Sequence, residues 1–215
     1  MNEAASQGQL FIISGPSGVG KSSLVQKLLE ESDRLKFSIS YTTRPKRPQE
    51  MDGVHYHFID QATFDQMVAE GQFLEHATYN NNSYGTPIPP INAWIQQGYG
   101  VILEIEVQGA RQLREKQDQL DIPMHFIFIL PPSFEHLKQR IQGRGTEDPE
   151  KQAKRLKIAQ HELEQADHFD INIINDDFDE AYRQLESHIK SLLTAKEPLN
   201  DFPDIVKGNQ QNQGD

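Results

Sequence analysis

Eight residues near the N-terminus have the types and spacing of a loop that binds the phosphates of a nucleotide. Their pattern is G-x-x-x-x-G-K-S, and its glycines let the backbone curl so that successive N–H groups point at phosphate oxygens. The lysine offers a mobile ammonium for the β- and γ-phosphates, and the serine offers a hydroxyl for Mg²⁺. We therefore expect a nucleoside triphosphate to bind at Gly15, Pro16, Ser17, Gly18, Val19, Gly20, Lys21 and Ser22.

A second group of polar residues suits a phosphate monoester. Arg44 and Arg47 lie three positions apart in a proline-bearing loop, so the loop is stiff and the two guanidinium groups can converge on one dianion. Tyr56 and Tyr84 could add phenolic donors. Solvated arginines on an exposed loop are the alternative, and the nearby tyrosines and the triphosphate loop argue against it.

Three carboxylates stand out because of the residues around them. Glu75 lies in an apolar-flanked strand pattern, where a carboxylate needs partners; a structural ion pair and recognition of a nucleotide base are both compatible with that position. Glu104 and Glu106 follow an apolar run at the carboxyl end of a predicted strand, and alternation would place both on one face of it. They are candidates for a Mg²⁺ site, with a structural pairing to lysines as the alternative.

The elements that must position these residues alternate between strands and helices. Apolar, β-rich runs predict five strands, at residues 10–14, 37–40, 101–105, 124–130 and 171–174. Amphipathic patterns predict helices at residues 21–31, 107–116, 133–142, 150–167 and 178–193. Near-continuous apolar strands separated by helices favour a parallel sheet covered on both faces. Residues 41–98 break this rhythm, and we expect an inserted subdomain there, with short antiparallel strands and one helix near residues 61–70.

Residues 42–58 resemble the guanylate kinase family. That family's pattern is T-[ST]-R-x-x-[KR]-x-x-[DE]-x-x-G-x-x-Y-x-[FY], and every specified position matches. Further matches are F-L-E-H-A, N-S-Y-G-T, L-E-I-E-V-Q-G, R-x-x-x-R-G and I-N-D-D, so that the resemblance covers residues 9–193. It implies an α/β, three-layer P-loop kinase fold with a five-stranded parallel sheet. It also implies a core at residues 9–40, 99–142 and 162–193, a small α+β GMP-binding insertion at residues 41–98 and a helical lid at residues 143–161.

The resemblance also implies a role for individual residues. Arg44, Arg47, Tyr56 and Tyr84 would hold the phosphate of GMP, and Glu75 would accept the two adjacent donors of guanine, where adenine presents an acceptor. Ser40 and Thr86 match hydroxyls near guanine O6. Gly85, Glu104 and Glu106 complete the residues assigned to the GMP side. The residues assigned to phosphate transfer are Lys21, Arg44, Arg140, Arg144 and Arg155.

Two assignments by resemblance carry alternatives. Asn175 is a candidate for the base or ribose of ATP, and a turn-capping asparagine is the alternative. Ser22 and Glu104 would hold Mg²⁺, but many family members have Asp at positions 104 and 106 where this chain has Glu. The extra methylene leaves open whether Glu104 reaches the ion directly or through water. Surface salt bridges are the alternative role for Arg140, Arg144 and Arg155.

The implied activity is transfer of the γ-phosphate of ATP to GMP and dGMP, giving GDP and ADP, with Mg²⁺, which recycles GMP in purine nucleotide metabolism. A non-catalytic guanylate-kinase-like module that binds phosphopeptides and another P-loop kinase of small phosphate compounds are the alternatives. The formal net charge of −11 disfavours nonspecific nucleic-acid binding, and no apolar run is long enough for a membrane span. With no cysteine and no signal-peptide pattern, we expect a cytoplasmic protein. Residues 195–215 are expected to be a disordered tail, and the sequence leaves monomer or homo-oligomer undecided.

Overall fold

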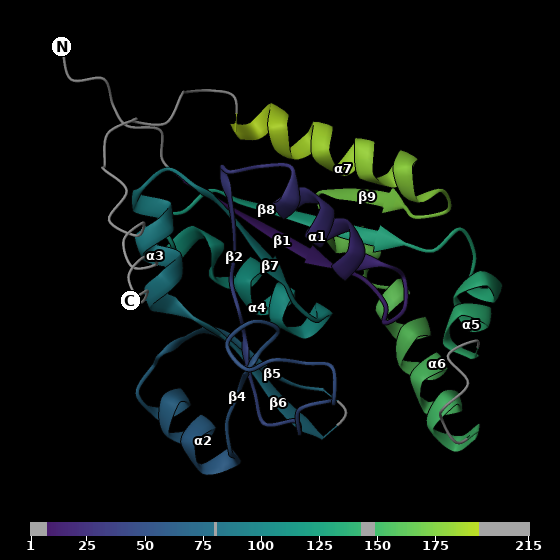
Figure 1. Ribbon diagram of the computed structural model, residues 1–215, viewed down its shortest axis with the longest axis horizontal. Coiled ribbons are helices and arrows are strands. Elements are labelled where there is room, and N and C mark those ends of the chain that lie inside the picture. The colour runs from purple at the N-terminus through teal and green to yellow at the C-terminus, as the bar shows by residue number, and fades with distance from the viewer. Residues whose placement is uncertain (1–7, 80, 143–148, 194–215) are drawn as a thin grey trace, which may run out of the picture.

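A parallel sheet runs through the centre of the computed structural model, which describes residues 8–79, 81–142 and 149–193 (Figure 1). Its five strands are arranged in the order β2-β7-β1-β8-β9, and all four pairings are parallel, as predicted. Their bounds are β1 (Gln9–Ser14), β2 (Leu35–Phe37), β7 (Gly100–Glu104), β8 (Met124–Leu130) and β9 (Ile171–Ile174). Because parallel strands meet with their carboxyl ends at one edge, β1, β7 and β8 deliver their following loops to the same place.

Helices cover both faces of this sheet. They are α1 (Lys21–Glu30), α3 (Ile88–Gln96), α4 (Val107–Lys116), α5 (Phe134–Gln142), α6 (Pro149–Leu163) and α7 (Phe178–Leu193). Two short 3₁₀ turns accompany them, η1 (Gln117–Gln119) and η2 (Ala166–His168).

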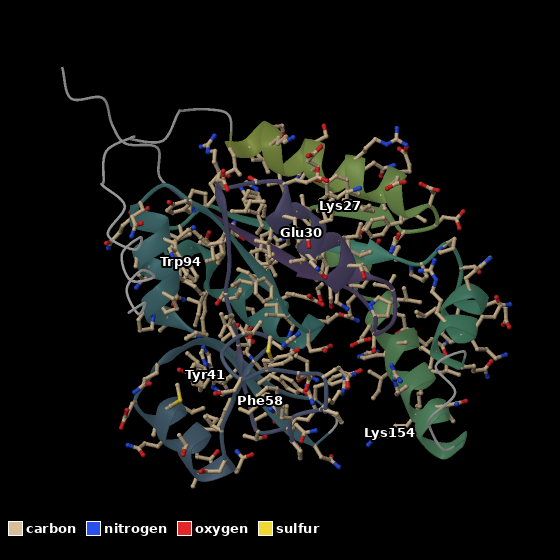
Figure 2. All side chains as sticks on the ribbon, in the orientation of Figure 1. Lys27, Glu30, Tyr41, Phe58, Trp94 and Lys154 are labelled. Carbon is tan, nitrogen blue, oxygen red and sulfur yellow. The ribbon has the colours of Figure 1, made fainter. Side chains whose placement is uncertain are left out.

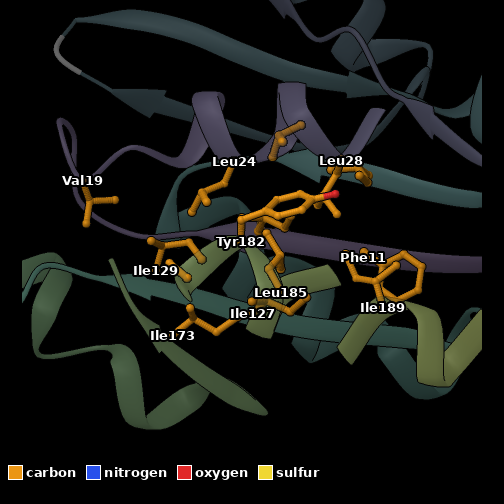
Figure 3. Close-up of a cluster of buried hydrophobic side chains, with 14 of the residues drawn as sticks. Phe11, Val19, Leu24, Leu28, Ile127, Ile129, Ile173, Tyr182, Leu185 and Ile189 are labelled. Atoms are coloured by element: carbon orange, nitrogen blue, oxygen red, sulfur yellow. The ribbon is translucent and has the colours of Figure 1, made fainter. Parts of the chain in front are cut away.

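Side chains of β1 alternate between two apolar cores. Phe11 and Ile13 pack with residues of α1 and α7, in the cluster that Figure 3 shows. Leu10 and Ile12 pack on the other face, with residues of α3 and α4. Since both faces are covered, β1 is apolar along nearly its whole length.

The inserted region forms a second, four-stranded sheet, in the order β4-β3-β6-β5. Its elements are β3 (Tyr41–Thr42), β4 (His57–Phe58), α2 (Gln61–Ala69), β5 (Phe73–Tyr79) and β6 (Asn82–Pro87). The β3–β6 and β5–β6 pairings are antiparallel, as expected, whereas β3 and β4 are parallel. Asp60 begins α2 by accepting a hydrogen bond from the Thr63 amide at 2.8 Å.

The structure differs from the sequence-based expectation at three elements. A second helix, α3, follows the small sheet, where only one helix, near residues 61–70, was expected for the inserted region. It begins with two prolines, which are tolerated in a first helical turn. Its residues Ile91 and Ile95 pack on the central sheet. Strand β2 spans Leu35–Phe37 rather than residues 37–40, because the chain then leaves the central sheet and pairs with β6 from Tyr41. Helix α6 ends at Leu163 rather than residue 167, and a 3₁₀ turn follows it. Within the described ranges, no helix has the length and apolarity of a membrane-spanning segment.

Candidate active site

The loop of residues 15–22 joins β1 to α1, in the strand–loop–helix arrangement that its pattern predicts. Gly15, Gly18 and Gly20 have φ angles of 140°, 88° and 102°, which side-chain-bearing residues rarely adopt. At Gly15 a Cβ would also lie 2.4 Å from the Ile129 carbonyl oxygen of β8. The glycines are thus required by the curl of the backbone and by its close packing on the sheet.

The ammonium of Lys21 lies against this loop. Its Nζ donates to the carbonyl oxygens of Gly15 at 2.5 Å and Pro16 at 3.1 Å. The lysine is thus held where the loop turns, and this is where the sequence placed the cation for the phosphates of a triphosphate. The helix that begins at Lys21 adds the positive end of its dipole to the same region.

Asn175 is hydrogen-bonded to the backbone of the loop. Its side-chain Nδ2 donates to the Val19 carbonyl at 2.7 Å, and its backbone amide donates to the Leu130 carbonyl at 2.8 Å. Arg140 reinforces both contacts, donating to the carbonyls of Val19 at 3.3 Å and Asn175 at 3.1 Å. The structure therefore brings Asn175 and Arg140 to the triphosphate loop as braces of its backbone, a role the sequence analysis did not foresee.

The two residues predicted to hold Mg²⁺ meet at the carboxyl end of β7. Ser22 Oγ, in the first turn of α1, donates to Glu104 Oε1 at 2.7 Å, and Glu104 pairs with Ile13 of the neighbouring strand β1. Both are hard oxygen donors, and Mg²⁺ keeps several waters, so this pair fits the ion. The described residues hold no group of three or more His, Cys, Asp or Glu side chains suited to a metal. Glu104 and Glu106 were expected to share one face of a strand, and this is wrong. Strand β7 ends at Glu104, and Glu106 is the N-cap of α4.

In the loop that follows β3, Arg44 is fixed by an unpredicted partner, Glu50. Its two terminal nitrogens donate to the two carboxylate oxygens at 3.0 and 2.8 Å, and the Arg47 amide donates to Glu50 at 2.8 Å. Burial opposes ionisation of Glu50, but these hydrogen bonds outweigh it and lower its pKa. The signal was visible as an acidic residue three positions after Arg47.

The predicted phosphate ligands are only partly brought together. The Arg44 guanidinium lies 5.5 Å from the centre of the Tyr56 ring, and the Tyr56 and Tyr84 rings lie 5.9 Å apart. Burial raises the pKa of the Tyr56 hydroxyl, so it remains a donor at neutral pH. Arg47 is different, because its side chain is 63% exposed and its nearest carboxylate contact is at 3.9 Å.

Glu75 and Thr86 form a buried pair across β5 and β6. Thr86 Oγ1 donates to Glu75 Oε1 at 2.5 Å, and the Glu75 residue is 4% exposed. Burial raises the pKa of this carboxyl to about 7, although the Thr86 hydrogen bond opposes the shift. Among the described residues, no Lys or Arg forms an ion pair with Glu75, so the structural ion pair that was the alternative is not found there.

Two further residues predicted on the GMP side line this sheet. Ser40 lies where the chain crosses from β2 to β3, and its carbonyl accepts from the His57 amide at 2.9 Å. Gly85 packs under Phe73, whose ring a Cβ would approach to 2.8 Å. Gly85 therefore serves the packing of β6, while Ser40 stands at the junction of the two sheets.

A family model for guanylate kinases matches residues 7–192. The chain belongs to the guanylate kinase family. It is 45% identical over 192 residues to a guanylate kinase of Zymomonas mobilis, covering 89% of this chain and 86% of that one, and 46% identical over 179 residues to one of Nostoc, covering 83% and 88%. The crystal structure of guanylate kinase from Anaplasma phagocytophilum superposes with a TM-score of 0.74 at 29% identity, covering 88% of each chain.

In this member of the guanylate kinase family, α6 contacts the triphosphate loop directly. A terminal nitrogen of Arg155 donates to Ser17 Oγ at 2.9 Å. Figure 2 shows where α6 lies: Lys154, next to Arg155 in sequence, stands apart from Tyr41 and Phe58, which lie in the small sheet. Arg144 and the first part of the predicted lid, residues 143–148, lie outside the described residues.

Glu162 is a further charged residue that the sequence analysis missed. It is seven positions after Arg155, so both lie on one face of α6, and it is only 6% exposed. Burial and the neighbouring Glu106 carboxylate raise its pKa to about 8, while the Ser17 amide opposes this shift. Helix α6 thus presents an arginine and a carboxyl group to the same loop residue, Ser17. The sequence shows only the seven-residue spacing of Glu162 from Arg155, and not its burial or its proximity to Ser17.

Proposed function

We propose that the protein transfers the γ-phosphate of ATP to GMP and dGMP, giving ADP and GDP. Membership in the guanylate kinase family supports the activity. The observation that carries the substrate assignment is the buried Glu75–Thr86 pair, with Arg44, Tyr56 and Tyr84 in the same inserted region. A buried carboxylate with no ion-pair partner among the residues that the structure describes suits the N1–H and 2-amino donors of guanine, and it would repel the N1 acceptor of adenine.

The chemistry that this site must perform is a transfer between two anions. An oxygen of the GMP phosphate attacks the γ-phosphorus, and the bond from that phosphorus to the β–γ bridging oxygen breaks, which releases ADP. The phosphate of GMP is largely ionised at neutral pH, so no general base is required. The protein must instead position the two nucleotides, offset their charge repulsion and exclude water.

Each half of the site has its own residues for this task. Lys21 and the loop amides would hold the β- and γ-phosphates, and Arg44 with the two tyrosines would hold the acceptor phosphate. Arg140 and Arg155 contact the loop now and would offset charge during transfer, together with Arg144. Ser22 and Glu104 would hold Mg²⁺, which when bound neutralises charge on the transferring phosphates. A cytoplasmic location is part of this proposal.

A coupled assay of ADP release with ATP and a panel of acceptors tests the proposal. GMP and dGMP are expected to give turnover, and AMP, CMP and UMP are expected to give little. A preference for another acceptor would favour a different P-loop kinase. The absence of turnover with every acceptor, together with binding of a phosphopeptide, would favour the non-catalytic module.

A further inference from the structure

Helix α4 of the core touches the small sheet at the residue proposed to recognise guanine. A Cβ placed on Gly109 would lie 2.2 Å from Glu75 Oε2 and 2.8 Å from its Cδ, distances that no real side chain tolerates. The Gly109 backbone therefore packs directly against the carboxylate, with nothing between them. Since Gly109 lies within a regular helix and its φ is negative, the backbone conformation does not require glycine there.

The next residue of β5 is held by the same helix. Gln112 Nε2 donates to the His76 carbonyl at 2.6 Å, and its Oε1 accepts from the His76 amide at 3.4 Å. Strand β5 is at the edge of its sheet, with β6 on one side only. One side-chain amide thus takes the place that a neighbouring strand would occupy at His76.

These two contacts come from one face of α4. Gly109 and Gln112 are three positions apart, the spacing at which helical residues are neighbours. On the opposite side of Glu75, Thr86 of β6 donates to Oε1. The carboxylate is therefore held from two sides, with one oxygen fixed by β6 and the other in contact with the backbone of α4.

We propose that Gly109 and Gln112 are positioning residues for guanine recognition, which act by fixing the orientation of the Glu75 carboxylate. The inference rests on the proposed function, in which Glu75 accepts the N1–H and 2-amino donors of guanine. Two donors on one base edge require both carboxylate oxygens to lie in the plane of the base, so a rotated carboxylate would lose one of the two hydrogen bonds. At Gly109 any side chain would displace the carboxylate, because that flexible group is nearer than any other atom.

The experiment compares GMP with IMP as acceptor. IMP keeps the N1–H donor and lacks the 2-amino group, so the ratio of kcat/KM for GMP to that for IMP measures recognition of the amino group. We expect Gly109→Ala to lower this ratio about tenfold, chiefly through a higher KM for GMP, while the KM for ATP stays within about twofold. Gln112→Leu keeps a side chain of similar size and removes both hydrogen bonds to His76, and we expect the ratio to fall about threefold.

Arg111→Ala is the matched control, because Arg111 is on the same helix and its side chain is 72% exposed. It should leave the ratio unchanged. In a Glu75→Gln background, Gly109→Ala should have little further effect on the ratio, because the group through which it acts is already altered. Alanine has a higher helix propensity than glycine, so the substitution does not weaken α4 itself, and a thermal melt checks that the variant is folded.

Three results would overturn the inference. The first is an unchanged GMP/IMP ratio in folded Gly109→Ala and Gln112→Leu proteins that turn over GMP; the proposed function would then stand and the positioning role would not. The second is an equal rise in the KM values for GMP and ATP, which would indicate general damage to the core. The third is a wild-type protein that does not phosphorylate GMP, which removes the proposed function as well.

Discussion

In the phosphate loop the groups offered to a ligand are mostly backbone groups, whereas in the small sheet they are side chains. The loop has its shape because three glycines adopt positive φ and because Asn175 and Arg140 hold the Val19 carbonyl. The inserted region instead presents Arg44 paired with Glu50 in a loop, and Glu75 paired with Thr86 in the small sheet. Backbone amides bind what all triphosphates share, and side chains distinguish one base from another.

The difference also concerns charge. The cations Lys21 and Arg140 donate to neutral carbonyl oxygens at the loop. Arg44, in the loop that follows β3, is already neutralised by a carboxylate, so a phosphate must compete with Glu50 for it. The donor half is therefore ready for an anion, and the acceptor half must exchange one anionic partner for another.

Removing the loop cation should have the largest effect. Lys21→Met deletes the ammonium that would hold the β- and γ-phosphates, and we expect kcat to fall by more than about a thousandfold. Binding of GMP, measured by calorimetry, should remain within about twofold, because the small sheet is untouched. Retained turnover in this variant would contradict the assignment of the loop.

Substitution of Glu75 should impair the use of GMP and leave the use of ATP intact, which is the reverse of the effect of Lys21→Met. Glu75→Gln presents an amide donor to the donor edge of guanine, so kcat/KM for GMP should fall about a hundredfold with the KM for ATP unchanged. Preference for GMP over AMP should fall as well. Unchanged kinetics with GMP, measured in the same assay, would assign Glu75 to structure rather than recognition.

A smaller change tests the exchange of partners at Arg44. Arg44→Lys keeps the charge and loses the planar fork that now bonds both Glu50 oxygens, so the KM for GMP should rise about tenfold. Lys46→Ala, at an exposed position of the same loop, is the control and should change the KM by less than about twofold. An equal effect of the two substitutions would show that loop charge, and not bidentate geometry, determines binding.

The fold could be predicted from the sequence because its signals are local and repeated. Five apolar runs and their intervening amphipathic helices gave the parallel sheet, and alternation along β1 explains its two cores. Helix α3 was not predicted because Pro89 and Pro90 resemble helix breakers, and only tertiary packing of Ile91 and Ile95 shows their place in a first turn. Its burial on the central sheet outweighs the local signal.

The candidate site was predictable where a motif encodes chemistry, and it was missed where distant residues support one another. Ser22, Glu104, Glu75 and Thr86 were each named individually before the structure, which shows that Ser22 bonds Glu104 and that Thr86 bonds Glu75. Nothing in the sequence pairs Glu162 with Ser17, Gly109 with Glu75, or Asn175 with the Val19 carbonyl. Those contacts span large sequence separations and depend on how the two sheets and α6 pack.

The effect of pH on the KM for GMP should differ from its effect on the KM for ATP. Burial raises the pKa of Glu75 from its ordinary 4.5 to about 7, with Lys116 opposing and Glu106 favouring the shift. Guanine requires the ionised form, so the KM for GMP should fall by about tenfold as pH rises from 6 to 8. The phosphate of GMP also titrates near pH 6, and Glu75→Gln isolates that contribution because it lacks the buried carboxyl. The KM for ATP should not share the change.

The stability of the nucleotide-free protein should fall with rising pH, whereas its affinity for GMP should rise. A carboxyl whose pKa is raised by folding stabilises the fold below its unfolded value of 4.5, and that contribution is lost as pH rises through about 7. Denaturant unfolding without nucleotide should therefore show falling stability between pH 5 and 8, and Glu75→Gln should flatten the curve. If the affinity for GMP and the stability of the nucleotide-free wild-type protein changed in the same direction with pH, Glu75 would not be the titrating group. Opposite changes would mean that the ionised, buried Glu75 carboxylate destabilises the free protein and finds further hydrogen-bond donors only when guanine binds.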